Sequence, residues 1–541
     1  MPRTWWTPAS VAIAAVVAVP VLSVALSLAT PRAEVWWHLW QTQLPELLVN
    51  TVALLAGVGV GALVVGGGLA WLIVHHRFPG RGLFEWALIL PLAVPGYVLA
   101  FAFLGTFDYA GPVQTALRAR LGAAVRLPDL GAYGSVVLVM TLAFYPYVYL
   151  LARAAFLEQG AATLETARAL GRSPWAAFRA VTLPLARPSI VAGVALAMME
   201  ALADFGTVAT FGYRTLTEAV YRVWYGMFDR AAATQIAALL LLFALALLVL
   251  ERSLRGRARF VQNRRRGPGI VPVRLGGGRA ATATTACALV LFAAFALPVG
   301  RLVVWATQAT GPAALGDALA SRAGMTVLLA SAAALATCAL GVVLAYARRL
   351  SPSRPVRIAT RLAVMGYAVP GAVIAVGVLV PLAWVDHALV TLARVAFGWS
   401  LALVLTGSAA GLVFAYVVRF LAVGFQTVDA TLTGVSPRLD EASRSLGAGV
   451  GAVLRRVHLP LLHRGLLTAL ALVFVETIKE LPATLLLRPL GVTTLAVEVW
   501  TRTAESLWAE AAVPGLAIVV AGLVPVVLTM RASGRATPPG T

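Results

Sequence analysis

Charged side chains inside otherwise apolar stretches are the residues of this sequence whose types and spacing could do chemistry. Four carboxylates and one amine stand in two such stretches: Glu200, Asp204, Glu476, Lys479 and Glu480. A spacing of four places Glu200 and Asp204 on one helix face, and Glu476 and Glu480 on another. Ionisable groups at membrane depth are costly and favour a water-filled path, and carboxylate oxygens suit hard cations. The alternative is structural: the acids pair with Lys479 or Arg488, or cap neighbouring helices.

The other reactive residue types form no recognisable site. Cys287 and Cys338 lie in apolar runs, which indicates neither a disulfide framework nor a metal cluster. The six histidines are scattered, so neither a permanent metal site nor a catalytic residue is predicted. The single lysine, Lys479, has no glycine-rich approach, whereas a P-loop ATPase needs a lysine on the nucleotide phosphates. The chain is therefore not expected to be an enzyme or to bind a cofactor itself.

The stretches that hold the charged groups indicate a membrane protein. The 541 residues are 60% hydrophobic and 12% charged, and the apolar residues gather into runs near or above the roughly 20 residues that cross a bilayer as a helix. Twelve spans are predicted: 9–30, 47–74, 84–106, 133–156, 187–209, 232–250, 281–303, 323–346, 360–382, 400–424, 464–484 and 511–530. We expect an all-α integral membrane protein with about 12 transmembrane helices.

The net charge of +21 fits the positive-inside rule better than nucleic-acid binding in such a protein. With the N-terminus in the cytoplasm, most of the 43 Lys and Arg residues fall in cytoplasmic loops, and Lys479 alone is assigned to the membrane. The run 9–30 is long for the apolar part of a signal peptide, so it is predicted to be a retained first helix. Both termini are expected in the cytoplasm.

The sequence repeats itself. The segment Ala93–Gly96 (Ala-Val-Pro-Gly) recurs 275 residues later as Ala368–Gly371. Other residues recur at an offset of 276: Glu165 as Glu441, Gly171 as Gly447, Pro184 as Pro460, Glu200 as Glu476 and Asp204 as Glu480. We predict two six-helix halves, 1–251 and 281–541, joined by a basic cytoplasmic linker, 252–280. An even number of spans makes the repeats parallel, about an axis along the membrane normal.

Each half carries a short motif between its fourth and fifth spans. In the first copy, residues 164–170 are good helix formers, and Gly171 suits the left-handed position just past a helix end. Ser173 can cap a second short helix, and Pro184 is expected to break the chain before the next span.

In the second copy, Ser436 is expected to begin the helix and Gly447 to end it, with Pro460 before the next span. A single basic loop of this kind would be an ordinary solvated loop. Two copies with identical spacing indicate instead that the loops have a functional role.

These loops resemble the Glu-Ala-Ala loop of permeases of binding-protein-dependent ABC importers. The matching residues are Glu165, Ala167, Leu170 and Gly171 with Pro184 in the first copy, and Glu441, Ala442, Leu446 and Gly447 with Pro460 in the second. Thr166 and Ser443 depart from the usual Ala of the family, but both are small. In that family a coupling helix in this loop sits in a groove of the ATPase subunit. The resemblance implies the type I ABC importer permease fold, with transmembrane domains over about 47–250 and about 321–530.

The resemblance also implies partners. Two loops in one chain imply two copies of a cytoplasmic ABC ATPase subunit, which would use ATP and Mg. The substrate would arrive on a periplasmic or lipid-anchored binding protein. The expected location is the bacterial cytoplasmic membrane, with lipid but no nucleic acid as a partner. An ion-coupled secondary transporter, the less favoured alternative, has no ATPase to dock.

The substrate is predicted from resemblance alone. Segments 202–208 and 479–489 resemble parts of the fused iron(III) permeases, whose fused length and two-copy layout also match. Fused thiamine permeases share the architecture and part of the first segment. Iron(III) is the predicted substrate, and thiamine or another small solute is the alternative.

Overall fold

The computed structural model describes residues 5–29, 33–122, 124–127, 131–159, 171, 173, 176, 178–255, 272–309, 312–351, 353–400 and 402–534. The elements before the linker are α1 (Trp6–Leu26), η1 (Ser27–Ala29), α2 (Ala33–Thr42), α3 (Leu44–Ala62), η2 (Leu63–Gly67), α4 (Gly68–His75), β1 (His76–Arg77), α5 (Arg81–Ala87), η3 (Leu90–Ala93), α6 (Gly96–Phe107), α7 (Pro112–Leu121), α8 (Gly131–Glu158), η4 (Phe178–Thr182), α11 (Leu183–Ala203), α12 (Phe205–Thr210), α13 (Leu216–Tyr221), η5 (Arg222–Gly226) and α14 (Arg230–Arg255).

The elements of the second part repeat this order. They are β2 (Val273–Arg274), α15 (Gly277–Leu291), η6 (Phe292–Ala296), α16 (Leu297–Gln308), α17 (Pro312–Leu350), α18 (Arg354–Ala363), η7 (Met365–Ala368), α19 (Gly371–Phe397), α20 (Ala409–Thr433), α21 (Pro437–Ser445), α22 (Val450–Val453), η8 (Leu454–His458), α23 (Leu459–Lys479), α24 (Pro482–Leu487), α25 (Leu495–Ala504) and α26 (Trp508–Gly534). The all-α prediction is confirmed, because the two strands are only two residues long and pair in parallel, His76 with Val273 and Arg77 with Arg274.

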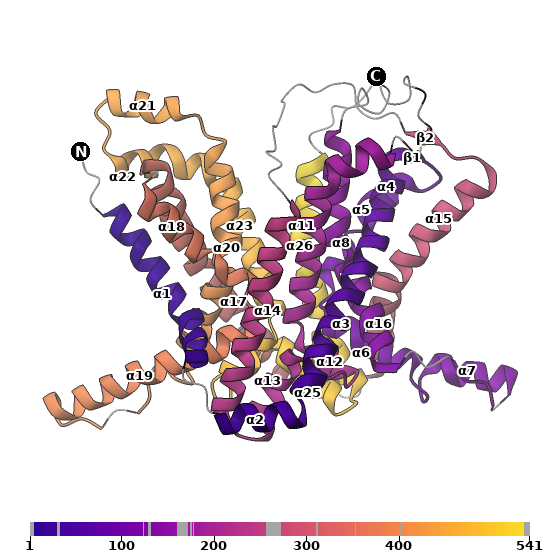
Figure 1. Cartoon of the computed structure of the whole chain (residues 1–541), viewed down its shortest axis with the longest axis horizontal. Helices are drawn as coiled ribbons and strands as arrows, with labels where there is room; N and C mark the ends of the chain where they lie inside the picture. The colour runs from indigo at the N-terminus through magenta and orange to yellow at the C-terminus, as the bar shows by residue number, and fades with distance from the viewer. Residues whose placement is uncertain are drawn as a thin grey trace.

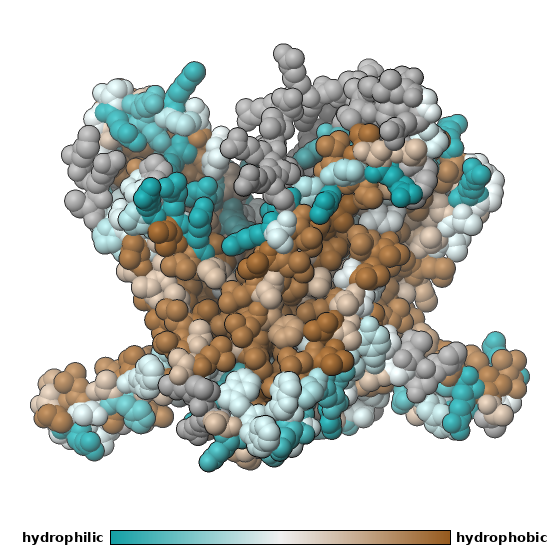
Figure 2. Space-filling view, viewed as in Figure 1, coloured by the Kyte–Doolittle hydropathy of each residue, from teal (hydrophilic) through white to brown (hydrophobic). Residues whose placement is uncertain are grey.

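Within the described residues, eleven helices are long and apolar enough to cross a membrane, or twelve if the bent pair Arg81–Ala93 and Gly96–Leu121 counts as one span. Figure 2 shows the resulting apolar band around the middle of the molecule, with hydrophilic side chains above and below it. Each of the twelve predicted runs overlaps one of these helices, although runs 360–382 and 400–424 begin well before the helices that start at Gly371 and Ala409. We call the end that carries α21 the loop face and the opposite end, with α2, α13 and α25, the far face (Figure 1).

The first helix of each repeat packs on the other repeat, which the predicted halves did not anticipate. Helix α1 lies against α18, α19 and α17 of the second repeat, on the left of Figure 1. In return, α16 packs against α6 of the first repeat, and α15 touches α5. Ser23 fixes the first exchange, because its hydroxyl donates to the carbonyl of Gly377 at 2.8 Å. The two halves are therefore interlocked rather than merely adjacent.

Two predicted spans, 84–106 and 360–382, are broken rather than continuous. The chain bends by 94° between Arg81–Ala93 and Gly96–Leu121, and the break falls at Pro95, whose ψ of 146° is not helical. Pro370 breaks the second repeat in the same way, with ψ 142°. Because a proline has no N–H to continue the helix, each break lets a new helix begin at Gly96 or Gly371.

Pro184 does not break the chain, so that prediction is wrong, and Pro460 in the second repeat does not break it either. In both repeats a π-helical turn, η4 or η8, runs directly into the long helix that contains the proline. A π turn changes the hydrogen-bond partners just before the proline, which allows the missing N–H within a continuous span.

Candidate functional site

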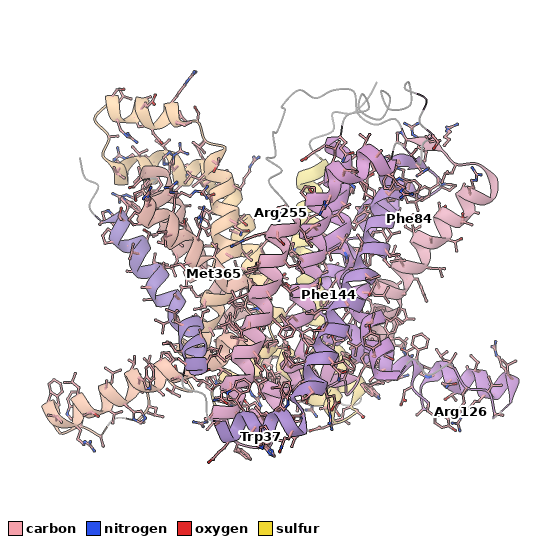
Figure 3. The ribbon with its side chains drawn as sticks, in the orientation of Figure 1. Trp37, Phe84, Arg126, Phe144, Arg255 and Met365 are labelled. Atoms are coloured by element: carbon pink, nitrogen blue, oxygen red, sulfur yellow. The ribbon has the colours of Figure 1, made fainter. Side chains whose placement is uncertain are left out.

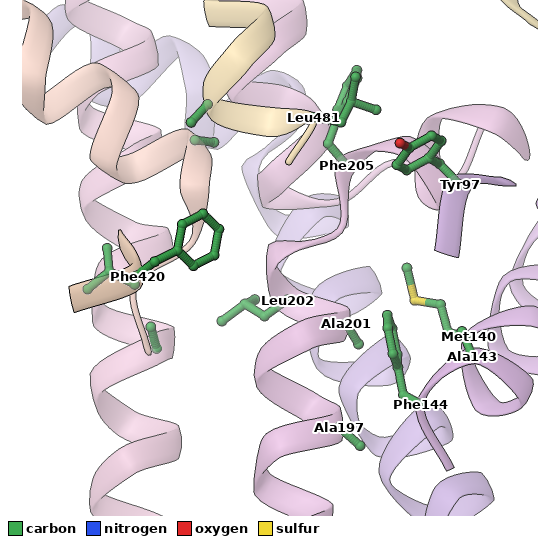
Figure 4. Packing of buried hydrophobic residues seen from close by; sticks show 14 of the residues in the cluster. Tyr97, Met140, Ala143, Phe144, Ala197, Ala201, Leu202, Phe205, Phe420 and Leu481 are labelled. Atoms are coloured by element: carbon green, nitrogen blue, oxygen red, sulfur yellow. The ribbon is translucent and has the colours of Figure 1, made fainter. Parts of the chain in front are cut away.

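A cavity of about 100 Å³ lies between the repeats. It is lined by Leu92, Val94, Pro95, Gly96, Tyr97, Ala143, Phe144, Tyr147, Glu200, Ala203, Asp204, Gly206, Arg419, Glu476, Lys479, Glu480 and Pro482. All five charged residues singled out in the sequence border this one space. Tyr97 and Phe144 of this lining belong to the buried hydrophobic cluster drawn in Figure 4.

Asp204 and Glu480 reach the cavity from breaks in the helices, whereas Glu200 and Glu476 lie inside α11 and α23, so neither pair stands on one continuous helix as predicted. Helix α11 ends at Ala203, and the side chain of Asp204 caps α12 by accepting from the Thr207 amide at 2.8 Å and the Thr207 hydroxyl at 2.7 Å. Helix α23 ends at Lys479, and the Glu480 carboxylate accepts from the Ala483 amide at 2.9 Å. The predicted capping alternative is thus realised at both breaks.

The second repeat supplies both cations of the cavity. Lys479 lies 2.8 Å from Glu476, which agrees with the structural alternative that an acid pairs with Lys479. Glu480 pairs at 3.2 Å with Arg419 of α20, and not with Arg488. Both side chains of this pair are almost fully enclosed, at 11% and 4% exposure.

Arg419 is the residue that sequence reasoning missed. From the sequence, Lys479 alone among the Lys and Arg residues is assigned to the membrane. Arg419 nevertheless lies inside the predicted span 400–424. Its signal was present: an arginine flanked by Val417, Val418 and Phe420 needs a buried partner in a bilayer.

The glycines of the repeated Ala-Val-Pro-Gly segment border the charged groups. A Cβ at Gly96 would overlap the Asp204 carboxylate, and one at Gly371 would overlap Arg419 and Glu480. Each glycine begins a helix, α6 or α19, so the positive end of the helix dipole faces a carboxylate. The repeated segment therefore has a local explanation: only glycine allows the acid to approach the helix start.

The cavity is electrostatically asymmetric. Four carboxylates against two cations give it a formal charge of minus two. Among the described residues, Glu200 and Asp204 of the first repeat have no ion pair; Glu200 instead accepts a hydrogen bond from the Tyr367 hydroxyl at 3.1 Å. The first repeat thus presents the unneutralised acids.

Two larger cavities flank this one. A cavity of about 450 Å³ opens toward the loop face between α14 and η7, where Arg255 and Met365 lie on opposite sides (Figure 3). A cavity of about 790 Å³ lies on the far side and is lined by Phe205, Tyr221 and Trp500, among others.

Inter-repeat contacts separate the three spaces. Tyr367 lines the loop-side cavity and bonds Glu200 of the central one. On the far side Tyr221 donates to the Pro482 carbonyl, and its ring stacks on Phe205 with centroids 3.9 Å apart. Tyr225 donates to the Leu485 carbonyl at 2.6 Å. Hydrogen bonds that cross the boundary between the repeats therefore stand on both sides of the central cavity.

The second loop motif folds as predicted. Ser436 caps α21 through the Arg438 amide, and Gly447 follows the helix with φ +77°. The Ala448 amide bonds the Ser443 carbonyl at 3.0 Å and the Gly447 amide bonds the Arg444 carbonyl at 2.9 Å, which is a Schellman ending. Glu441 and Ala442 lie within α21, and Leu446 is its C-terminal cap, 87% exposed.

Of the first motif, Glu165, Ala167 and Leu170 lie outside the described residues. Gly171 has φ +80°, matching Gly447. The predicted cap is also present, since the Ala176 amide donates to the Ser173 hydroxyl at 3.3 Å.

Helix α21 is fastened to the ends of two long helices. The buried Asp440 accepts from Arg349 of α17 at 2.8 Å and lies 2.7 Å from His458 of η8. Arg349 also donates to the carbonyls of Leu432 and Val435. His458 is 1% exposed, so this contact is buried. A displacement of α21 would therefore pull on the long helices of the second repeat.

The comparisons with known proteins define the class. The family described as "Binding-protein-dependent transport system inner membrane component" matches residues 62–259 and, a second time, residues 337–536. The two matches cover more than half of the chain, which belongs to this family. It is the permease subunit of an ABC importer: a multi-pass transport subunit, with the ATPase on a separate chain and a substrate-binding protein as a further partner.

Individual relatives carry different substrates in their names. The chain is 27% identical over 91% of both chains to the Fe(3+)-transport system permease protein FbpB 2 of Haemophilus influenzae. It is 25% identical to the probable ABC transporter permease protein y4fN of Sinorhizobium fredii, over 80% of this chain and 78% of the relative. The molybdenum transport system permease protein ModB of Escherichia coli is 30% identical over 34% of this chain and 78% of its own length.

A solved structure, that of a bacterial ABC transporter involved in the import of the acidic polysaccharide alginate, is 16% identical with a TM-score of 0.37. The match covers 44% of this chain and 89% of that chain.

Proposed function

We propose that this permease imports iron(III), with the charged central cavity as the place where the cation crosses between the repeats. The observation that carries the proposal is the formal charge of minus two in that cavity, where Glu200 and Asp204 have no ion-pair partner within the described part of the chain. Carboxylate oxygens are the ligands that hard cations prefer. Because Thr207 and Tyr367 already occupy part of the carboxylate oxygens, binding would be weak and transient, as passage requires.

The same charge argues against the oxyanion relatives. Molybdate and sulfate, named in partial-length relatives, would be repelled by a cavity of net negative charge. The full-length relative carries Fe(3+) in its name. Thiamine is itself a cation, so the charge does not separate it from iron, and it remains the alternative substrate.

The coupling we propose follows the two loop motifs. Two copies of an ABC ATPase, using ATP and Mg, would dock at the loop face, one on the motif of Glu165, Ala167, Leu170 and Gly171 and one on that of Glu441, Ala442, Leu446 and Gly447. The loop face would then be cytoplasmic, with both termini on that side, in the inner membrane of a bacterium. The binding protein would deliver its cargo to the far face.

The test is uptake into proteoliposomes that hold the permease with its ATPase, supplied with the binding protein and ATP. We expect accumulation of radioactive iron(III) that stops when ATP is withheld, and no accumulation of molybdate. Accumulation of labelled thiamine without iron would overturn the iron assignment and leave the importer class untouched.

A further inference from the structure

The outer part of α19 projects sideways from the bundle. The continuous buried part of this helix ends at Val378, and beyond it only Asp386 and Ala393 are buried. The segment Trp384–Phe397, which we call the lateral arm, extends away on the left of Figure 1, level with the far end of the apolar band. At about 1.5 Å per residue its length is about 20 Å, and no other described helix covers it.

Hydrogen bonds to a later loop hold the arm in an ordered conformation. Asp386 is fully enclosed, and its carboxylate accepts from the amides of Val404 at 3.0 Å, Leu405 at 2.9 Å and Thr406 at 2.6 Å. These bonds fasten the returning loop along the arm. A single carboxylate satisfying three backbone donors holds a loop against a helix firmly.

The exposed surface of the arm has two chemically different faces. At about 3.6 residues per turn, Trp384, Val385, Ala388, Leu389, Leu392 and Val395 share one face, while His387, Thr391 and Arg394 share another. The apolar face is strongly exposed: Trp384 at 67%, Leu392 at 61% and Val395 at 78%. A polar face beside a broad apolar face is the pattern of a helix that lies in a membrane interface.

The position of the arm fits the same interpretation. Figure 2 shows hydrophobic side chains over most of the arm, next to the apolar band, and hydrophilic ones along its lower edge. Phe397 and Trp399 lie at the tip with ring centroids 5.1 Å apart, and aromatic rings concentrate at membrane interfaces.

The first repeat has a counterpart on the opposite side. Helix α7 projects to the right in Figure 1 at the same level. Arg118 of α7 lies over the ring of Tyr109 at 3.9 Å, and Arg126 lies 5.6 Å from the same ring. Both arginines lie on the far face, and the positive-inside rule does not account for basic residues at that position. A lipid phosphate would pair with them.

We propose that the lateral arm lies in the headgroup layer of the far-side leaflet, with its apolar face in the acyl chains and Arg394 at the phosphates. The partner is thus the bilayer itself, not the binding protein. The inference is independent of the substrate.

The test uses the full chain, with Cys287 and Cys338 replaced by Ala, in nanodiscs of phosphatidylethanolamine and phosphatidylglycerol. Nitroxide labels are placed at Leu392→Cys and Ala388→Cys on the apolar face, and at His387→Cys and Thr391→Cys as matched controls. Collision with oxygen and with a water-soluble nickel chelate is measured by electron paramagnetic resonance.

We expect the oxygen-to-nickel ratio at the two apolar-face labels to be several-fold higher than at the controls. Equal exposure of all four labels to nickel would place the arm in water and overturn the proposal. So would nickel exposure of Leu392→Cys that disappears only when the binding protein is added, because the apolar face would then be a protein docking surface.

Discussion

The hydroxyl of Tyr367 donates a hydrogen bond of 3.1 Å to Glu200, from the second repeat to the first. This bond stands where the central cavity meets the loop-side cavity, and Tyr367 borders the latter. On the other side, Tyr225 makes a comparable inter-repeat bond to the Leu485 carbonyl. Tyr367 and Tyr225 thus join the two repeats on opposite sides of the central cavity, the first beside the loop-side cavity and the second beside the far-side cavity.

Tyr367→Phe is expected to open the central cavity toward the loop face. A hydrogen bond to a charged group contributes about 1.5–3 kcal/mol, so labelling of Ala203→Cys by a water-soluble thiol reagent from that side should accelerate by about tenfold or more. Tyr225→Phe is the matched control and should leave the rate unchanged. Equal acceleration by both variants would show general loosening rather than a local closure.

Arg419→Met is expected to destabilise the protein, because it leaves Glu480 as a buried charge without its cation. Removing one partner of such a pair costs about 3–5 kcal/mol, which should lower the thermal midpoint of the purified protein. The double variant R419M/E480Q should recover most of the loss.

Arg348→Met is the comparison for this pair. Arg348 lies 3.0 Å from Asp429 but is 53% exposed, so its pair should contribute about 1 kcal/mol or less. A midpoint lowered as much by R348M as by R419M would contradict the importance assigned to burial.

The sequence predicted those parts of the fold that depend on local chemistry. The spans followed from runs of apolar residues, the repeat from two constant offsets, and the left-handed glycine from the helix ending before Gly447. Prolines were harder to interpret. Pro146 and Pro188 lie inside continuous helices, whereas Pro95 stands at a break and precedes α6. The outcome depends on whether packing can satisfy the freed backbone groups.

The features that could not be predicted from the sequence are those that depend on contacts between segments distant in the chain. Arg419 can be buried only because Glu480, which lies distant in the chain, pairs with it. The packing of α1 on the second repeat has no local signal in the sequence of α1. The lateral arm was also hidden. Residues 384–397 continue an apolar pattern, and only the clamp of Asp386 on the later loop shows where the helix leaves the bundle.

Glu200→Gln and Asp204→Asn are each expected to reduce iron(III) uptake by about tenfold. Each removes one of the unneutralised charges that would attract the cation, an interaction of a few kcal/mol at an effective dielectric of about 20. Initial uptake rates in proteoliposomes provide the measurement.

Glu46→Gln is the control for the acid variants, since Glu46 is 52% exposed and lies 3.8 Å from Arg214. It should transport normally. Normal uptake by E200Q and D204N as well would remove the cavity acids from the translocation path.

Gly447→Val is expected to uncouple ATP hydrolysis from uptake while leaving the protein in the membrane. Open space surrounds Gly447, so the substitution meets no neighbour, but its φ of +77° is strained for a β-branched residue by about 1–2 kcal/mol. Gly449 is the matched control: it also has open space, and its φ of −71° and ψ of 160° suit valine. Uptake should therefore fall in G447V and persist in G449V, with equal amounts of both in the membrane. If G447V imports at the normal rate with its ATPase still attached, the left-handed turn after α21 is not needed for coupling.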